Sequence, residues 1–477
     1  METLSLTGEM PIRRRTRRDP KPRFKADRIK QLDAVGGCID LQVPDEHLAR
    51  SVWRIVARFD LSTVEAQYSS LGRHGYSPRN VLAVWVYASL IGMHEGTKVS
   101  RLLQTDAAMR FLSGGHRISR AKLNEFRAEH VELFTDVIRQ TVAMAHAEGF
   151  LPVDDLAADS MRLRAHASLK KVRSVNRSTA RLNTLRAVAE SEQTEAEREQ
   201  IGRHEAVLKE CAARGKQSLV ATNPSAVMMK FPDGSVAPGH RMTTVSAGVK
   251  ERFIVAVLVT PDASDYGMLE PAVETALAML EQAGIPGGTK LALAADAGYA
   301  SLNDLIYTDR VRERIDILVD AAHPTGVGRS KFFGHDRFQF AADGASATCP
   351  AGRAMTRRRQ FSDGTTEWNG VGCGTCPLRP ECTAAKQRTV TVHLERERLR
   401  AAMKARLLSP DGKQRYSRRM ANIEPVFSNI ESNMHFRRAS SRRETTVIAE
   451  VMLKVLAHNV SRLLVARRLR CVYLVFN

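Results

Sequence analysis

Cysteines, aromatic residues and long apolar segments are all scarce in this sequence. Of 477 residues, 7 are Cys, 3 are Trp and 6% are aromatic. An odd, sparse cysteine set disfavours a disulfide-stabilised secreted protein and favours a reducing cytoplasm. The longest apolar run, around residues 81–93, is too short to cross a bilayer, and the charged N-terminus does not resemble a secretory signal. We therefore expect a cytoplasmic protein with no membrane partner.

Acidic residues are outnumbered by basic ones. The chain has 72 Lys and Arg against 52 Asp and Glu, a formal net charge of +20 at pH 7, and a pI near 10.0. This excess fits a polyanionic partner, because each basic side chain that neutralises a phosphate releases condensed counterions. Ribosomal and membrane-surface proteins share the property, so the charge indicates a class of partner and no function.

Composition and the periodicity of apolar residues divide the chain into a basic arm and at least two folded parts. Residues 1–30 are rich in Arg and Pro and poor in apolar residues, so we expect a disordered arm that contacts nucleic acid rather than a solubilising tail. The candidate contacts in this arm are Arg13, Arg14, Arg15, Arg17 and Arg18.

Residues 31–150 repeat apolar positions at spacings of three and four, which predicts an all-α domain. After the Gly114-Gly115 break, Arg120 and Lys122 occupy the first turn of a predicted helix. A helix-turn-helix that reads DNA is one interpretation, and a plain helical bundle is at least as well supported. We predict that this domain binds DNA.

Beyond residue 150, short strand-like runs alternate with helical patterns, which predicts an α/β domain formed by residues 151–330 and 387–477. Two segments interrupt it. Residues 178–216 are charged and predict an inserted helical hairpin, and residues 331–386 form a Cys-rich insert.

Three acidic residues stand in contexts that suit metal ligands. Asp159 and Asp296 each end a strand-like apolar run, and Glu424 is predicted to lie at the start of a helix, with Pro425 in the first turn. Two-metal phosphoryl transfer needs hard oxygen ligands that clamp the attacking and leaving oxygens. A chain with 52 acidic residues offers many such triples, so the local context and not the acids themselves carries the prediction.

Three blocks of sequence resemble one enzyme family. The segments DDLAADSMRLRAHAS, LALAADAGYAS and RRMANIEPVFSNIESNMHFRR, with a later AEVMLKVLAHNVSRLL, resemble the catalytic blocks of bacterial insertion-sequence DDE transposases. The helical region before residue 150 also resembles their N-terminal helical domain. The resemblance spans nearly the whole chain except the basic arm. The residues that match are Asp159, Asp296-Ala297-Gly298-Tyr299, Glu424-Pro425-Val426-Phe427 and Ala457-His458-Asn459.

The resemblance implies an α/β fold: an RNase H-like mixed sheet flanked by helices, preceded by the all-α domain. Asp159 and Asp296 would come from adjacent strands and Glu424 from a packed helix, together holding two Mg²⁺ (or Mn²⁺) ions, with Asp159 bridging both. The implied activity is cleavage and strand transfer of an insertion sequence. The implied partner is double-stranded DNA, both element ends and target, bound by a homodimer or larger assembly at the bacterial nucleoid.

The resemblance also marks one departure among the DNA contacts. Members of the family often carry a basic residue two turns after the Glu, where this chain has Glu431, and Arg437 or Arg438 could substitute for it. Two tyrosines near the site are either DNA contacts or packing residues. The further candidate contacts are Arg162, Arg164, Tyr299, Tyr416, Arg418, Arg419, Arg437 and Arg438.

Four cysteines in the second insert are spaced like a metal site. Cys349, Cys373, Cys376 and Cys382 include a CxxC pair flanked by Gly and Pro, which favours one structural Zn²⁺. The gap before Cys382 is longer than usual, and four reduced cysteines in an ordinary insert are the alternative.

Several functions remain open from the sequence. A metal-dependent nuclease of the same fold would lack strand transfer, and a catalytically decayed copy would only bind DNA. A zinc-ribbon RNA-binding protein would explain the charge and the cysteines but not the three acidic blocks.

Overall fold

The computed structural model describes residues 22–34, 36–70, 73–286, 290–321, 332–334, 337–341 and 343–476. The candidate DNA contacts between residues 13 and 18 lie outside the described residues. Within the described ranges, no helix is long and apolar enough to cross a membrane.

The N-terminal part is helical, as the periodicity predicts. Side-chain caps begin several of its helices: His47 accepts from Ala49 N, Asp106 from Met109 N and Ser119 from Lys122 N. The helices are α1 (Leu48–Val56), α2 (Ser62–Glu65), α3 (Pro78–Leu90), α4 (Gly96–Thr105), α5 (Ala107–Leu112), α6 (Arg120–Glu129) and α7 (Val131–Ala147).

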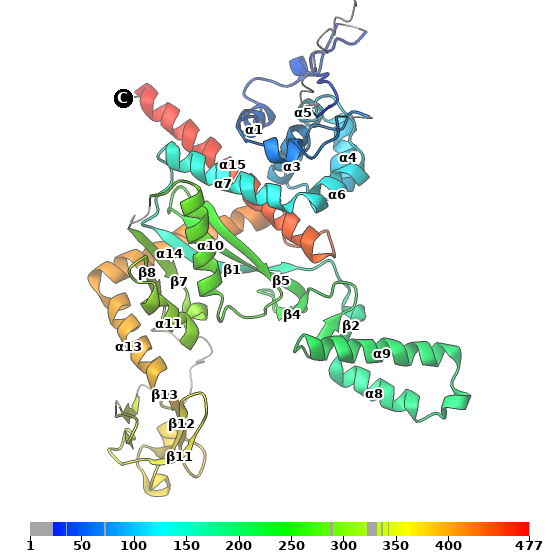
Figure 1. Ribbon diagram of the computed structural model, residues 1–477. Helices are drawn as coiled ribbons and strands as arrows, with labels where there is room; N and C mark the ends of the chain where they lie inside the picture. Colours follow the sequence, from blue (N-terminus) through cyan, green and yellow to red (C-terminus); the bar gives the residue numbers. More distant parts are fainter. Residues whose placement is uncertain are drawn as a thin grey trace, which may run out of the picture.

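A mixed sheet forms the centre of the molecule. Its strands are β1 (Leu156–Arg164), β4 (Val227–Lys230), β5 (Val236–Ala247), β6 (Phe253–Thr260), β7 (Leu291–Ala295) and β8 (Ile315–Val319). The order is β4-β5-β1-β7-β8, and β6 also pairs with β5. Pairing is antiparallel among β4, β5, β6 and β1 and parallel between β1, β7 and β8. The predicted fold class, a mixed sheet flanked by helices after a helical region, is confirmed (Figure 1).

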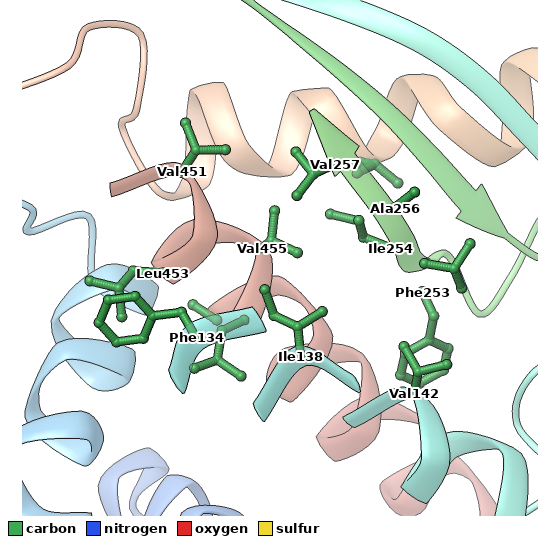
Figure 2. Packing of buried hydrophobic residues seen from close by; sticks show 14 of the residues in the cluster. Phe134, Ile138, Val142, Phe253, Ile254, Ala256, Val257, Val451, Leu453 and Val455 are labelled. Carbon is green, nitrogen blue, oxygen red and sulfur yellow. The ribbon is translucent and has the colours of Figure 1, made fainter. Parts of the chain in front are cut away.

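Helices from the second half of the chain cover this sheet. They are α10 (Leu269–Gln282), α11 (Leu302–Arg310), α13 (Leu394–Leu408), α14 (Pro410–Ser428) and α15 (Glu444–Phe476). The long α15 packs against α3, α7 and β6. Figure 2 shows the result: Phe134 and Ile138 of α7 meet Val455 of α15 and Ile254 of β6. The N-terminal helices and the sheet therefore share one hydrophobic core.

Asn459, on α15, fastens this core through hydrogen bonds. It is fully buried, and its side chain accepts from Ile254 N (2.9 Å) and donates to Ile254 O (2.9 Å) and to Thr141 Oγ1 (3.1 Å). The amide satisfies a backbone N–H and C=O of β6 that would otherwise be buried without partners. The Asn of the Ala-His-Asn match thus joins α15, α7 and the sheet and stands apart from any chemistry.

Two insertions extend away from the body (Figure 1). The first, here called the helical arm, consists of β2 (Val172–Ser174), α8 (Val175–Arg186), α9 (Glu195–Ala213) and β3 (Ser218–Val220). The second carries β9 (Gln339–Phe340), β10 (Ala347–Thr348), β11 (Thr356–Gln360), β12 (Thr365–Asn369), α12 (Arg379–Cys382) and β13 (Thr389–His393). Its three-stranded sheet β11-β12-β13 runs on to His393, past the predicted boundary at residue 386.

Candidate active site

Asp159, inside β1, and Asp296, directly after β7, lie next to each other where the pairing of these two neighbouring strands ends. The parallel pairing of β1 and β7 ends with Ala157 beside Ala294 and Ala158 beside Ala295, so the next residue on each strand is one of the two acids. Burial, and then the charge of Asp296, raise the pKa of Asp159 to about 6. Burial also raises the pKa of Asp296. Two carboxylates that disfavour each other's ionisation are a natural site for a cation.

A guanidinium occupies part of this site. Arg419 of α14 donates to Asp159 Oδ2 at 3.0 Å, and both side chains are mostly buried. Asn422, one turn later and fully buried, fixes the helix: it accepts from Ser246 Oγ and donates to Asp155 O at 2.7 Å. The helix is thereby tied to β5 and to the start of β1, so Arg419 faces the two acids.

A third carboxylate, Asp265, lies beside the pair, and no motif in the sequence marks it. Asp265 accepts from Ser160 Oγ and from the guanidinium of Arg241, which is only 2% exposed. Asp265 contributes to the raised pKa of Asp296. A Cβ placed on Gly298 would come within 3.0 Å of Asp296 Oδ1 and 3.1 Å of Asp265 Oδ2, so the glycine allows the approach.

These groups line a cavity of about 500 Å³ with basic walls. Arg164 binds Asp233 at 2.6 Å and covers the Phe231 ring. The segment that carries Arg437 pairs with the end of β1, since Arg164 N donates to Arg437 O (3.2 Å) and Arg164 O accepts from Ala439 N (2.9 Å). The predicted DNA contacts brought to this cavity are Arg162, Arg164 and Arg437.

Glu424 does not join the two aspartates in this structure. It is exposed on α14, one turn before Phe427, which lines the cavity. The prediction that a helix begins near Glu424 is wrong, because α14 begins at Pro410, where Ser409 caps it. Pro425 is therefore a helix-interior proline.

The interior proline has a local compensation. Pro425 has no N–H to donate to the carbonyl of Ala421, and Arg252 Nε donates to that oxygen at 3.2 Å. Beyond Ser428 the helix widens into a π-helical turn over Asn429–Asn433. Such turns are frequent at functional sites. This one brings Glu431 to the cavity wall, opposite in charge to the arginines there.

Among the described residues, no group of three or more His, Cys, Asp or Glu side chains is arranged to hold a metal ion. The donor chemistry of Asp159 and Asp296 fits a divalent cation, while Arg419 holds one oxygen of Asp159 and Glu424 stands apart. Cys349, Cys373, Cys376 and Cys382 are all free thiols and line one small cavity of about 20 Å³, not at ligand spacing.

The two tyrosines predicted as DNA contacts, Tyr299 and Tyr416, differ in how far they are buried. Tyr299 is fully buried, so the predicted contact with DNA is wrong and the residue packs in the core. The sequence could not separate these cases, because the Asp-Ala-Gly-Tyr run continues from a buried strand into a short 3₁₀ turn. Tyr416 is half-buried, with the Arg419 guanidinium 5.8 Å from its ring centroid.

The remaining predicted contacts lie away from the cavity lining. Arg120 and Lys122 are exposed in the first turn of α6, and Lys122 binds Glu125 at 2.6 Å. Arg418 and Arg438 are exposed as well. The structure therefore leaves these side chains open to solvent without bringing them to the aspartates.

Two family models match the chain, on either side of the strands that carry the aspartates. One, a transposase DDE domain, matches residues 348–464, and the other, a transposase domain (DUF772), matches residues 38–129. Both describe transposases, in the order that the resemblance predicts. Neither model spans half of the chain, and together they support an insertion-sequence DDE transposase. No curated protein matches it.

A solved structure with a match is the cryo-EM structure of the piggyBac transposase synaptic complex with hairpin DNA. It is 9% identical, with a TM-score of 0.32 over 88% of this chain and 73% of that chain. The likeness is too slight to support an argument. The DDE-domain match includes Glu424, whereas Asp159 and Asp296 precede it. For this transposase, the pairing of the two aspartates rests on strand register.

Proposed function

We propose that this transposase cleaves DNA at the ends of its element and joins it to a target, using Asp159, Asp296 and Glu424 to hold Mg²⁺ or Mn²⁺. The observation that carries the proposal is the register of β1 and β7. It delivers two acids to one cavity with basic walls. When bound, the cations would activate the attacking oxygen and stabilise the leaving oxygen.

Two rearrangements accompany metal binding in this proposal. Arg419 must release Asp159 Oδ2, since one lone-pair region of that oxygen is engaged at 3.0 Å. Glu424 must also approach the aspartates. It stands on the exposed flank of α14 and is followed after Pro425 by the π-helical turn. A helix that already lacks a hydrogen bond and widens nearby can adjust there at low energetic cost.

The chain's own residues would bind and orient the DNA. Arg162, Arg164 and Arg437 stand on the cavity wall, where their guanidinium groups can donate to phosphate oxygens. Once free of Asp159, Arg419 would be placed to hold the phosphate next to the carboxylates. The negative charge of Glu431 on the same wall would repel the phosphate backbone, and the positive charge of Arg437 would offset this repulsion.

Joining two element ends requires that two active sites act together. We propose that the transposase works as a homodimer or larger assembly on double-stranded DNA. Light scattering with and without end-containing DNA tests this: a mass of at least two chains per complex supports it, and a persistent monomer opposes it.

The experiment that tests the activity uses a labelled duplex with candidate element ends, a target plasmid, and Mg²⁺, Mn²⁺ or EDTA. Metal-dependent cleavage followed by a covalent link between label and plasmid is the expected result. Cleavage without joining would indicate a nuclease. Binding without cleavage on several candidate ends would indicate a DNA-binding protein that has lost its chemistry.

A further inference from the structure

The stretch between the first aspartate and the tip of the helical arm contains no acidic residue. Residues 160–189 hold eight Lys and Arg and not one Asp or Glu. Two other stretches of similar length, 66–94 and 451–477, also lack acidic residues, but they hold only two and five Lys and Arg. The basic residues are Arg162, Arg164, Lys170, Lys171, Arg173, Arg177, Arg181 and Arg186.

The structure converts this stretch into a path that leads out of the active-site cavity. It starts on β1, passes through β2 and continues along α8, which Figure 1 shows pointing away from the body. The base of the arm is held by the antiparallel pair β2-β3 and by a small core of Ala165, Val220 and Ala226. The arm is therefore joined to the sheet by packing as well as by the chain.

One face of α8 packs against α9, and the rest of its surface is exposed. Ser178, Leu182 and Leu185 are buried. Arg177 and Arg181, spaced four residues apart, are exposed and lie on one side of the helix. The remaining exposed positions of α8 are small or polar, which suits contact with a hydrated polyanion better than with an apolar protein surface.

Three acids of α9 pair with other arginines, and the pKa of Glu197 is lowered by hydrogen bonds with Thr194 and, to a smaller degree, by the charge of Arg181. On α9, Glu199 binds Arg203, Glu205 binds Arg186 and Glu210 binds Arg214. Arg181 donates to the neutral Gln200 at 3.1 Å. In the described part of the chain, neither Arg177 nor Arg181 forms an ion pair with a carboxylate, so their charges remain available.

We propose that α8 binds the phosphate backbone of the double-stranded DNA that flanks the active site. The inference rests on the proposed function, because it takes the DNA to lie in the cavity from which the basic path starts. With 12 residues, α8 is about 18 Å long and can follow roughly five base pairs. Contacts of this kind position the duplex without reading its sequence.

The test compares two matched double variants by fluorescence anisotropy on a labelled random-sequence duplex several helical turns long, with EDTA present. Arg177→Gln with Arg181→Gln removes two charges from exposed positions of α8. Arg203→Gln with Lys209→Gln removes two charges from exposed positions of α9. All four positions are exposed, so both variants should fold, which circular dichroism and thermal denaturation verify.

The α8 variant is expected to bind more weakly, with a log–log salt dependence less steep by about 1.8, corresponding to two lost phosphate contacts. The α9 variant should match the parent. Equal behaviour of the α8 variant and the parent, or equal losses in both variants, would overturn the proposal. So would a change of oligomeric state in the α8 variant without a change in DNA affinity, which indicates a protein contact.

The result is separable from that of the proposed chemistry. If the α8 variant shows the expected loss of affinity and salt dependence but the parent cleaves no DNA with any metal, the arm proposal stands and the catalytic proposal fails. If the parent cleaves and joins DNA while the α8 variant binds like the parent, the reverse holds.

Discussion

The Arg419 guanidinium lies 3.0 Å from Asp159 Oδ2, although the two residues are 260 positions apart in the chain. The side chains are 12% and 22% exposed, so the pair is poorly screened by water. In the absence of metal, this contact supplies the positive charge that two neighbouring carboxylates need. The same contact must break when a cation takes that oxygen, which makes Arg419 a competitor of the metal.

Replacing Arg419 should therefore weaken the metal-free protein and favour the metal-bound one. For Arg419→Gln, we expect a loss of up to about 3 kcal/mol of stability without metal, because Asp159 keeps a buried charge without its partner. Added Mn²⁺ should raise the melting temperature of this variant more than that of the parent. Thermal denaturation with and without Mn²⁺ measures both effects. Arg418→Gln, an exposed neighbour, is the control, and an Arg419 variant that behaves like it would contradict the prediction.

The raised pKa of Asp159 predicts a pH dependence of stability. A carboxyl whose pKa is higher in the folded state favours folding when protonated, so this contribution is lost as pH rises from about 4 to about 6. The rise from 3.8 to about 6 corresponds to roughly 3 kcal/mol. Asp159→Asn should then stabilise the metal-free protein above pH 6 and change little near pH 4.

Urea denaturation of the parent and of Asp159→Asn at pH values across this window checks the prediction. Asp309→Asn, on an exposed position of α11, is the control and should follow the parent. A stability difference between the parent and Asp159→Asn that does not vary with pH would mean that the pKa of Asp159 is the same in the folded and unfolded states.

Arg241 is predicted to position the site without touching DNA. Its buried guanidinium binds Asp265, Ser160 Oγ, and the carbonyls of Asp262 and Ala263. Arg241→Met should cost about 3–5 kcal/mol, since Asp265 is left next to two other acids. Adding Asp265→Asn should restore part of the stability and of the Mn²⁺ affinity, measured by titration calorimetry. A double variant no better than Arg241→Met would show that the arginine acts only by filling space.

The structural zinc stays a prediction. Four thiols line one small cavity, and Arg388 N approaches Cys373 Sγ at 3.5 Å, as backbone donors often do with bound thiolates. The predicted result is about one zinc per chain by elemental analysis of the purified protein, lost in Cys376→Ser and kept in Cys211→Ser, which changes a buried isolated cysteine. If the parent protein binds no zinc after reconstitution with Zn²⁺, the prediction is wrong.

The strands that present Asp159 and Asp296 were predictable because an apolar run precedes each acid, although β1 continues past Asp159 to Arg164. The strand β5 does not stand out in the sequence, although it pairs with β1 along the whole length of β1. Its buried residues include His240, Arg241 and Thr244, so it lacks the apolar alternation that marks a strand. Because polar side chains of β5 are buried near the site, the apolar alternation that would predict this strand is absent from the sequence.

Asp265 and Arg241 could not be selected from the sequence for a related reason. They are brought together by pairing between β5 and its neighbours and by the loop after β6, and neither has a fixed spacing from Asp159. The course of α14 was likewise obscured. Its first half is charged and polar, so the apolar period near Ile423 suggested a later start than Pro410.

The most direct test of the central claim is DNA cleavage by Asp296→Ala and Glu424→Ala beside the parent and the surface control Asp309→Ala. The account predicts metal-dependent cleavage by the parent and the control, and none by the two site variants, which should still bind DNA with parental affinity. Cleavage by Asp296→Ala at the parental rate would contradict the assignment of the metal site. If Glu424→Ala cleaves DNA and Asp296→Ala does not, another carboxylate must complete the metal site, and Asp265 and Glu431, which line the same cavity, are the candidates.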